Sequence, residues 1–142
     1  MATVELRFSA LPEHVRTARL VAAAVARRAG VDEAVLDEVR LAVGEACSRA
    51  VGLHQSSGIT SPVKVALIEE EKQFSIEVGD EAPHAVRGEG TAAQEGEAEA
   101  EEDEMGLAVI SGLVDDVKVT TGENGGLIRM TWPTAPPPAA LV

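Results

Sequence analysis

Two apolar stripes with helical spacing constrain the fold of this chain more than any other feature of its sequence. The first follows Pro12 and Glu13, which suit the first turn of a helix, and it ends at Gly30. The second follows Asp32, a good N-cap residue, and runs to about Val51 before a predicted loop over residues 52–62. Because a helix with an apolar stripe must bury that side, both helices need a second layer to pack against.

Segments in which apolar and polar residues alternate supply that second layer. Alternation of this kind is typical of strands with one buried face. The predicted strands cover residues 3–9, 63–67, 74–78, 117–120 and 127–132. We expect one hairpin turn at Glu70-Glu71 and another at Asn124-Gly125-Gly126, a strong hairpin signal.

The order of these elements predicts the fold class. A short apolar helix opening at Met105-Gly106-Leu107 and ending near Val114 gives three helices in all. The prediction is an α/β protein, more narrowly an α+β two-layer sandwich. About three helices pack on one face of a mixed, mostly antiparallel sheet of about five strands. Aromatic residues make up only 2% of the chain, so the core must be aliphatic.

The predicted domain covers residues 1–134, and a Pro-rich tail over residues 135–142 is expected to be disordered. The 142 residues suit one domain with one core. Within the domain, residues 88–104 have no apolar periodicity, so we expect a mobile loop there.

The charge of the chain is concentrated in that loop. The net charge is −12, and residues 88–104 hold eight acids and no base. The rest of the chain has 16 acids against 12 bases, a balance of −4, and it offers no basic stripe for nucleic acid.

No apolar run is long enough to span a bilayer, and we expect no membrane partner. The N-terminus lacks the pattern of a secretory signal, and the single Cys47 cannot form an internal disulfide. These features predict a cytoplasmic protein. Arg outnumbers Lys nine to three and Ala is abundant, which suggests a GC-rich bacterial genome.

Three short stretches carry residues suited to nucleotide chemistry. The second helix has Glu45 and Arg49 four positions apart, on one face of the helix. Asp80 follows a predicted strand, with Ala82 and His84 close behind it. Gly106 and Leu107 open the third helix, which continues into an apolar run that ends in Val114-Asp115-Asp116-Val117.

Together with the closing strand, these stretches resemble the smallest form of the GHKL, or histidine-kinase-like, ATPase fold. The resemblance covers residues 4–133 and is closest to the RsbW-like anti-sigma factors, which are also serine kinases. It implies that Glu45 is a remnant of the general base and that Asp80 accepts a hydrogen bond from the adenine amino group. It also implies that Gly106 and Leu107 provide backbone on the phosphate side of the site.

The chain departs from the family pattern at three positions. The family has an Asn at position 49, where it holds Mg²⁺, whereas a guanidinium has only donors and cannot coordinate a cation. Ala82 and His84 replace two glycines that allow close approach to the base. The resemblance implies ATP and Mg²⁺ as cofactors, and these departures predict that ATP binding is weakened or lost and that no metal is held by the usual ligand.

Other interpretations of the same residues remain open at this point. Glu45 and Arg49 can form a surface pair at i,i+4, or Arg49 can grip a phosphate directly. Asp80 can cap the turn after its strand. His54 is expected to face the solvent.

The resemblance implies a regulator that exchanges partners. Those partners would be a sigma factor, an anti-anti-sigma protein of the STAS type and a second copy of the chain. The alternative is an active serine kinase that phosphorylates the STAS partner. A third hypothesis makes the acidic residues 88–104 a nucleic-acid mimic for a basic partner.

Overall fold

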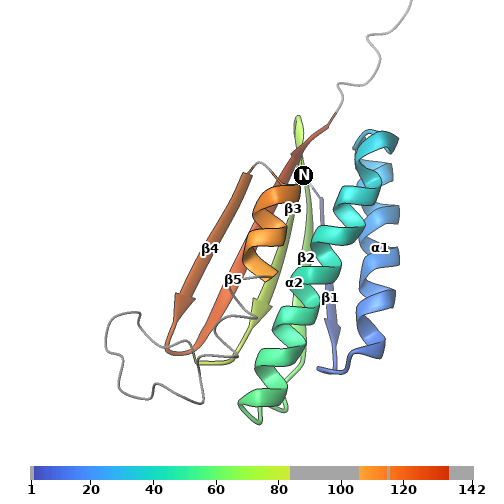
Figure 1. Cartoon of the computed structure of the whole chain (residues 1–142). Helices are drawn as coiled ribbons and strands as arrows, with labels where there is room; N and C mark the ends of the chain where they lie inside the picture. The colour runs from blue at the N-terminus through green and yellow to red at the C-terminus, as the bar shows by residue number, and fades with distance from the viewer. Residues whose placement is uncertain (1, 84–105, 115, 135–142) are drawn as a thin grey trace, which may run out of the picture.

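The computed structural model describes residues 2–83, 106–114 and 116–134 (Figure 1). The first half of the chain contains β1 (Ala2–Phe8), α1 (Glu13–Ala29), a 3₁₀ turn over Glu33–Val35 and α2 (Leu36–Ser56). The hairpin of β2 (Val63–Glu70) and β3 (Gln73–Asp80) follows. Residues 106–113 are helical, and β4 (Asp116–Gly122) and β5 (Gly125–Pro133) form a second hairpin.

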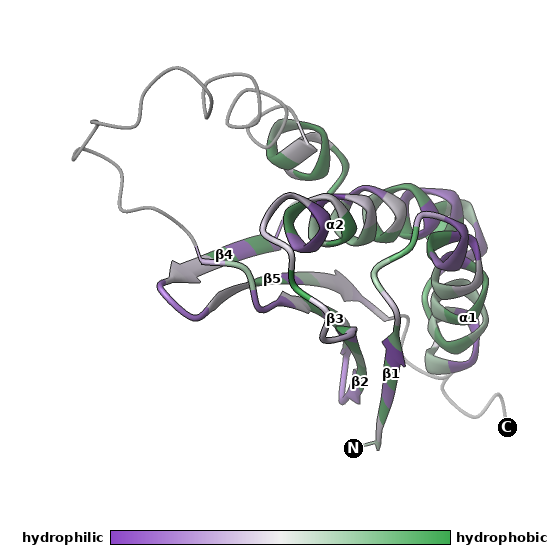
Figure 2. Ribbon diagram, turned by 90° about the horizontal axis from the view of Figure 1, so that it is seen from below, coloured by the Kyte–Doolittle hydropathy of each residue, from purple (hydrophilic) through white to green (hydrophobic). Residues whose placement is uncertain are grey.

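The five strands form one open sheet in the order β1-β2-β3-β5-β4, and every pairing is antiparallel. Both long helices and the 106–113 helix lie on the same side of the sheet (Figure 2). Three helices on one face of a five-stranded antiparallel sheet confirm the predicted α+β fold.

The core lies between the two layers and is aliphatic, as the composition predicts. From α2 it includes Val39, Val43 and Cys47, and these residues pack in one cluster with apolar side chains from β2, β3 and β5. The 106–113 helix adds Ile110 to the same cluster. The ring of Trp132 on β5 stacks on the ring of Phe74 on β3, with the centroids 6.5 Å apart.

Local signals in the sequence account for the end of α1 and for the turn before α2, although α2 itself begins at Leu36 rather than directly after Asp32. Gly30 closes α1 in the left-handed conformation at φ 101°. Asp32 accepts a hydrogen bond from the backbone N–H of Ala34 and so caps the 3₁₀ turn.

The end of α2 also differs from the prediction, which was wrong there. The helix continues past Gly52 to Ser56, five residues beyond the expected end at Val51. Its last turns are held by tertiary contacts of the fully buried His54, described below. These contacts outweigh the helix penalty of Gly52, about 1 kcal/mol relative to alanine.

The second hairpin differs from the prediction by one residue. Gly122 pairs with Gly125, so the chain reverses at Glu123-Asn124 rather than over Asn124-Gly125-Gly126. Gly125 has a φ of 141°, which favours glycine. Among the described helices, none combines the length and the apolar character needed to cross a membrane.

Cys47 provides a direct test of the packing of α2. Burial raises the pKa of its thiol to about 12, because the thiolate would lose its hydration. We expect a thiol reagent at pH 8 to label the folded chain about a thousandfold more slowly than the urea-unfolded chain, since only the thiolate reacts. The reaction can be followed by absorbance, because the chain has one cysteine. Labelling of folded protein at the unfolded rate would contradict the packing of α2 described here.

Candidate functional site

The residues singled out in the sequence gather where the second half of α2 faces the end of β3. Glu45 and Arg49 lie on α2, and Asp80 is the last residue of β3. Gly106 and Leu107 begin the described part of the 106–113 helix, which lies beside α2 (Figure 1). His84 and the acidic residues 88–104 lie outside the described residues.

Arg49 and Asp80 form a buried ion pair. The Arg49 Nη1 lies 3.9 Å from the Asp80 Oδ2, and the two side chains are 6% and 2% exposed. Two charges removed from water lose hydration energy, which only a close opposite charge and further hydrogen bonds can offset. The side chain of Arg49 therefore points inward, to a partner that sequence reasoning did not name.

The turn after β3 holds the Asp80 carboxylate in place. Asp80 Oδ1 accepts a hydrogen bond of 3.0 Å from the backbone N–H of Ala82, as in an Asx turn. On the other side, a Cβ added to Gly125 would collide with the carbonyl oxygen of Asp80, so the β4–β5 hairpin packs directly on this backbone. The carboxylate thus has a fixed position, set by backbone from two strands.

His54 fixes the same turn from α2. Its side chain is fully buried, so the expectation that it faces the solvent was wrong. The ring Nε2 accepts from the backbone N–H of Glu81 at 2.9 Å, and Nδ1 lies 3.0 Å from the carbonyl oxygen of Ser61, to which it donates. This pattern assigns the neutral tautomer, with one nitrogen as donor and the other as acceptor. No local pattern distinguishes this histidine, because both of its partners are backbone groups, one in the loop after α2 and one 27 positions away at Glu81.

Glu45 and Gly106 lie close together. The Glu45 Oε2 is 3.9 Å from the position that a Cβ on Gly106 would take, and Glu45 is exposed. Leu107 is half-buried and packs against the core. The structure thus brings Glu45 close to Gly106 on the exposed side of α2. Arg49 and Asp80 meet between α2 and the end of β3.

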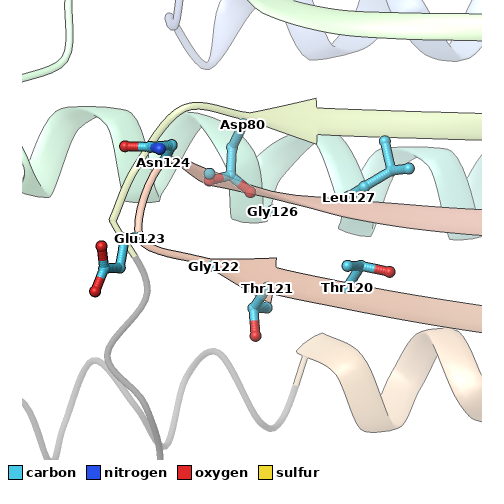
Figure 3. Close-up of a pocket in the computed structure, with 9 residues that line it drawn as sticks. Asp80, Thr120, Thr121, Gly122, Glu123, Asn124, Gly126 and Leu127 are labelled. Carbon is cyan, nitrogen blue, oxygen red and sulfur yellow. The ribbon is translucent and has the colours of Figure 1, made fainter.

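A shallow hollow lies beside Asp80, on the side of the β4–β5 hairpin (Figure 3). Its volume is about 390 Å³, and residues 120–127 form the rest of its lining. Of the site residues expected from the sequence, only Asp80 lines it. Within the described parts of the chain, no cluster of three or more His, Cys, Asp or Glu side chains could hold a metal ion.

The sequence profile of the histidine kinase-like ATPase domain matches residues 8–132, which include every site residue discussed above. This chain belongs to that family, whose description implies ATP as the nucleotide.

The structure is similar to the crystal structure of the RsbU and RsbW domains of Rv1364c from Mycobacterium tuberculosis. The TM-score is 0.69 at 17% sequence identity, and the match covers 96% of this chain and 33% of that chain. The present chain therefore spans about a third of that protein, and the likeness establishes an RsbW-like fold. A search of curated proteins finds no match.

The ion pair can be tested with a double-mutant cycle. Asp80→Ala leaves the Arg49 guanidinium buried without this carboxylate, and we expect the free energy of unfolding to fall by about 3 kcal/mol. The double variant Arg49→Ala/Asp80→Ala should lose at least about 1 kcal/mol less than the sum of the single losses. Urea unfolding followed by the fluorescence of Trp132, the one tryptophan, measures each value.

The matched control for this cycle is the pair of Arg28 and Glu69. Its 2.9 Å contact is shorter, but the Arg28 side chain is 65% exposed. Solvent screening should keep its coupling energy below about 1 kcal/mol. Additive losses for Arg49 and Asp80 would show that their contact contributes nothing to stability.

Proposed function

We propose that this chain is an anti-sigma-factor-like regulator of transcription. It binds a sigma factor, is captured in turn by a STAS-type anti-anti-sigma protein, and has weakened or lost ATP binding. The observation that carries the proposal is the buried Arg49–Asp80 pair in an RsbW-like fold.

The charges at this pair support the weakening of ATP binding. At position 49 a metal ligand needs a lone pair, and the guanidinium has none to offer. The Asp80 carboxylate is 2% exposed and already faces a cation, so a nucleobase would have to displace Arg49 to reach it. Control by partner exchange needs neither the metal nor phosphoryl transfer.

The proposal predicts a complex that forms without nucleotide. Purified sigma factors from the same genome should include one that binds the chain with a Kd in the micromolar range or below, measured by biolayer interferometry in buffer free of ATP. Unphosphorylated STAS proteins from that genome should include one that binds the chain and displaces the sigma factor. Addition of ATP and Mg²⁺ should change the Kd of the sigma-factor complex and the Kd of the STAS complex by no more than about twofold. Failure of every sigma factor to bind, with and without nucleotide, would refute the proposal.

An active serine kinase is the second candidate function, and the position of Glu45 beside Gly106 favours it. A base must lie within reach of the hydroxyl that attacks the phosphate. In this function Glu45 acts as the base, and Gly106 and Leu107 flank the phosphates. Asp80 then accepts a hydrogen bond from the adenine amino group.

Thermal unfolding with ATP or ADP, each with and without Mg²⁺, separates the two functions. A ligand at one hundred times its Kd stabilises a fold by about 2.7 kcal/mol, a shift of several degrees in Tm. We expect no Mg²⁺-dependent shift for the unmodified chain. The triple variant Arg49→Asn/Ala82→Gly/His84→Gly, which restores the family pattern, should gain one. A Mg²⁺-dependent shift in the unmodified chain, with phosphate transferred to a STAS serine, would favour the kinase.

A further inference from the structure

Replacement of a metal-binding Asn does not by itself explain why the Arg49 side chain is buried. An arginine that had only replaced a metal-binding Asn could extend into solvent, because a long charged side chain gains hydration there. Instead its side chain is 94% buried and its Nη1 lies 3.9 Å from the Asp80 Oδ2. The guanidinium therefore takes up space next to the carboxylate itself.

We infer that Arg49 is an intramolecular competitor for Asp80. Its guanidinium donates N–H groups toward the carboxylate, and the exocyclic amino group of adenine is likewise an N–H donor. The block to base binding is thus the guanidinium, independently of any metal ligand. This inference deepens the proposed weakening of ATP binding and rests on it.

The surroundings of Asp80 indicate that its carboxylate would remain in place without Arg49. The hydrogen bond from Ala82 N–H fixes Oδ1, and His54 holds the next residue of the turn through Glu81 N–H. The backbone of Asp80 is also packed against Gly125. None of these contacts involves Arg49, so shortening residue 49 should open space in front of Oδ2 without releasing the turn.

Adenosine is the probe that tests this inference, because it carries the base without phosphates and needs no metal. We expect the unmodified chain to show no shift in Tm with adenosine. Arg49→Ala should gain a saturable shift, with an apparent Kd at least about tenfold lower than any residual value for the unmodified chain. Such a ratio corresponds to about 1.4 kcal/mol. The matched control Arg49→Lys, which keeps the positive charge beside Asp80, should show no shift.

Two further measurements connect the effect to Asp80. Asp80→Ala in the Arg49→Ala background should abolish the shift, because alanine has no oxygen to accept a hydrogen bond from the adenine amino group. Methylguanidinium at millimolar concentration should compete with adenosine for Arg49→Ala, whereas methylammonium, which lacks the planar fork, should compete less.

Arg49→Gln is the second variant, in case Arg49→Ala does not fold. Glutamine removes the charge but keeps a hydrogen-bond donor beside Asp80, so the fold should be less destabilised. A folded Arg49→Ala or Arg49→Gln chain, verified by circular dichroism and Trp132 fluorescence, that ignores adenosine would overturn the inference. An equal shift in the unmodified chain would also overturn it. Sigma-factor binding by the unmodified chain is measured separately, so failure of the proposed function is distinguishable from failure of this inference.

Discussion

The packing of α2 on the central strands is the interaction on which the rest of this structure depends. One face of the helix buries Val39, Val43 and Cys47 against the sheet, and removal of aliphatic area from water is the main source of stability for such a fold. The same helix carries Glu45, Arg49 and His54, so the position of every candidate group on α2 is set by the core beneath it. With almost no aromatic residues, this core relies on close contact of small side chains, which leaves little freedom for the helix to shift.

The buried polar groups at the end of β3 form a second, smaller centre of order. His54 joins α2 to the β3 turn and to the carbonyl of Ser61, and Arg49 joins α2 to the last residue of the strand. Each of these groups would be costly to bury alone, and each has a polar partner: backbone groups for His54 and the Asp80 carboxylate for Arg49. The proposed loss of ATP binding rests on this contact between the Arg49 guanidinium and the Asp80 carboxylate.

Particular elements show how far local patterns could lead. The cap at Gly30 was predictable because it depends on a few neighbouring residues, and the structure confirms it. Asp32 is also a cap, but of the 3₁₀ turn before α2 rather than of α2 itself. The end of α2 was not predictable, because Gly52 signals a break that His54 overrides through contacts with residues distant in the sequence. Spacing and family resemblance identified one set of candidate site residues: Glu45, Arg49, Asp80, Gly106 and Leu107. Their roles remain proposals, since spacing does not say which side chains meet.

By itself, the sequence determined the order of the elements, the aliphatic core and the two-layer α+β fold, because periodicity and turn chemistry are local properties of the chain. The family followed from the resemblance of its motifs and from the profile match over residues 8–132. Tertiary structure alone decided that Arg49 turns inward to Asp80 and that His54 is buried as a neutral hydrogen-bonding group. Both outcomes depend on bringing α2 against the end of β3, a contact between residues about 30 positions apart. Only in the folded chain are these polar groups removed from water, and each then needs a partner within the protein: Asp80 for Arg49, and backbone groups for His54.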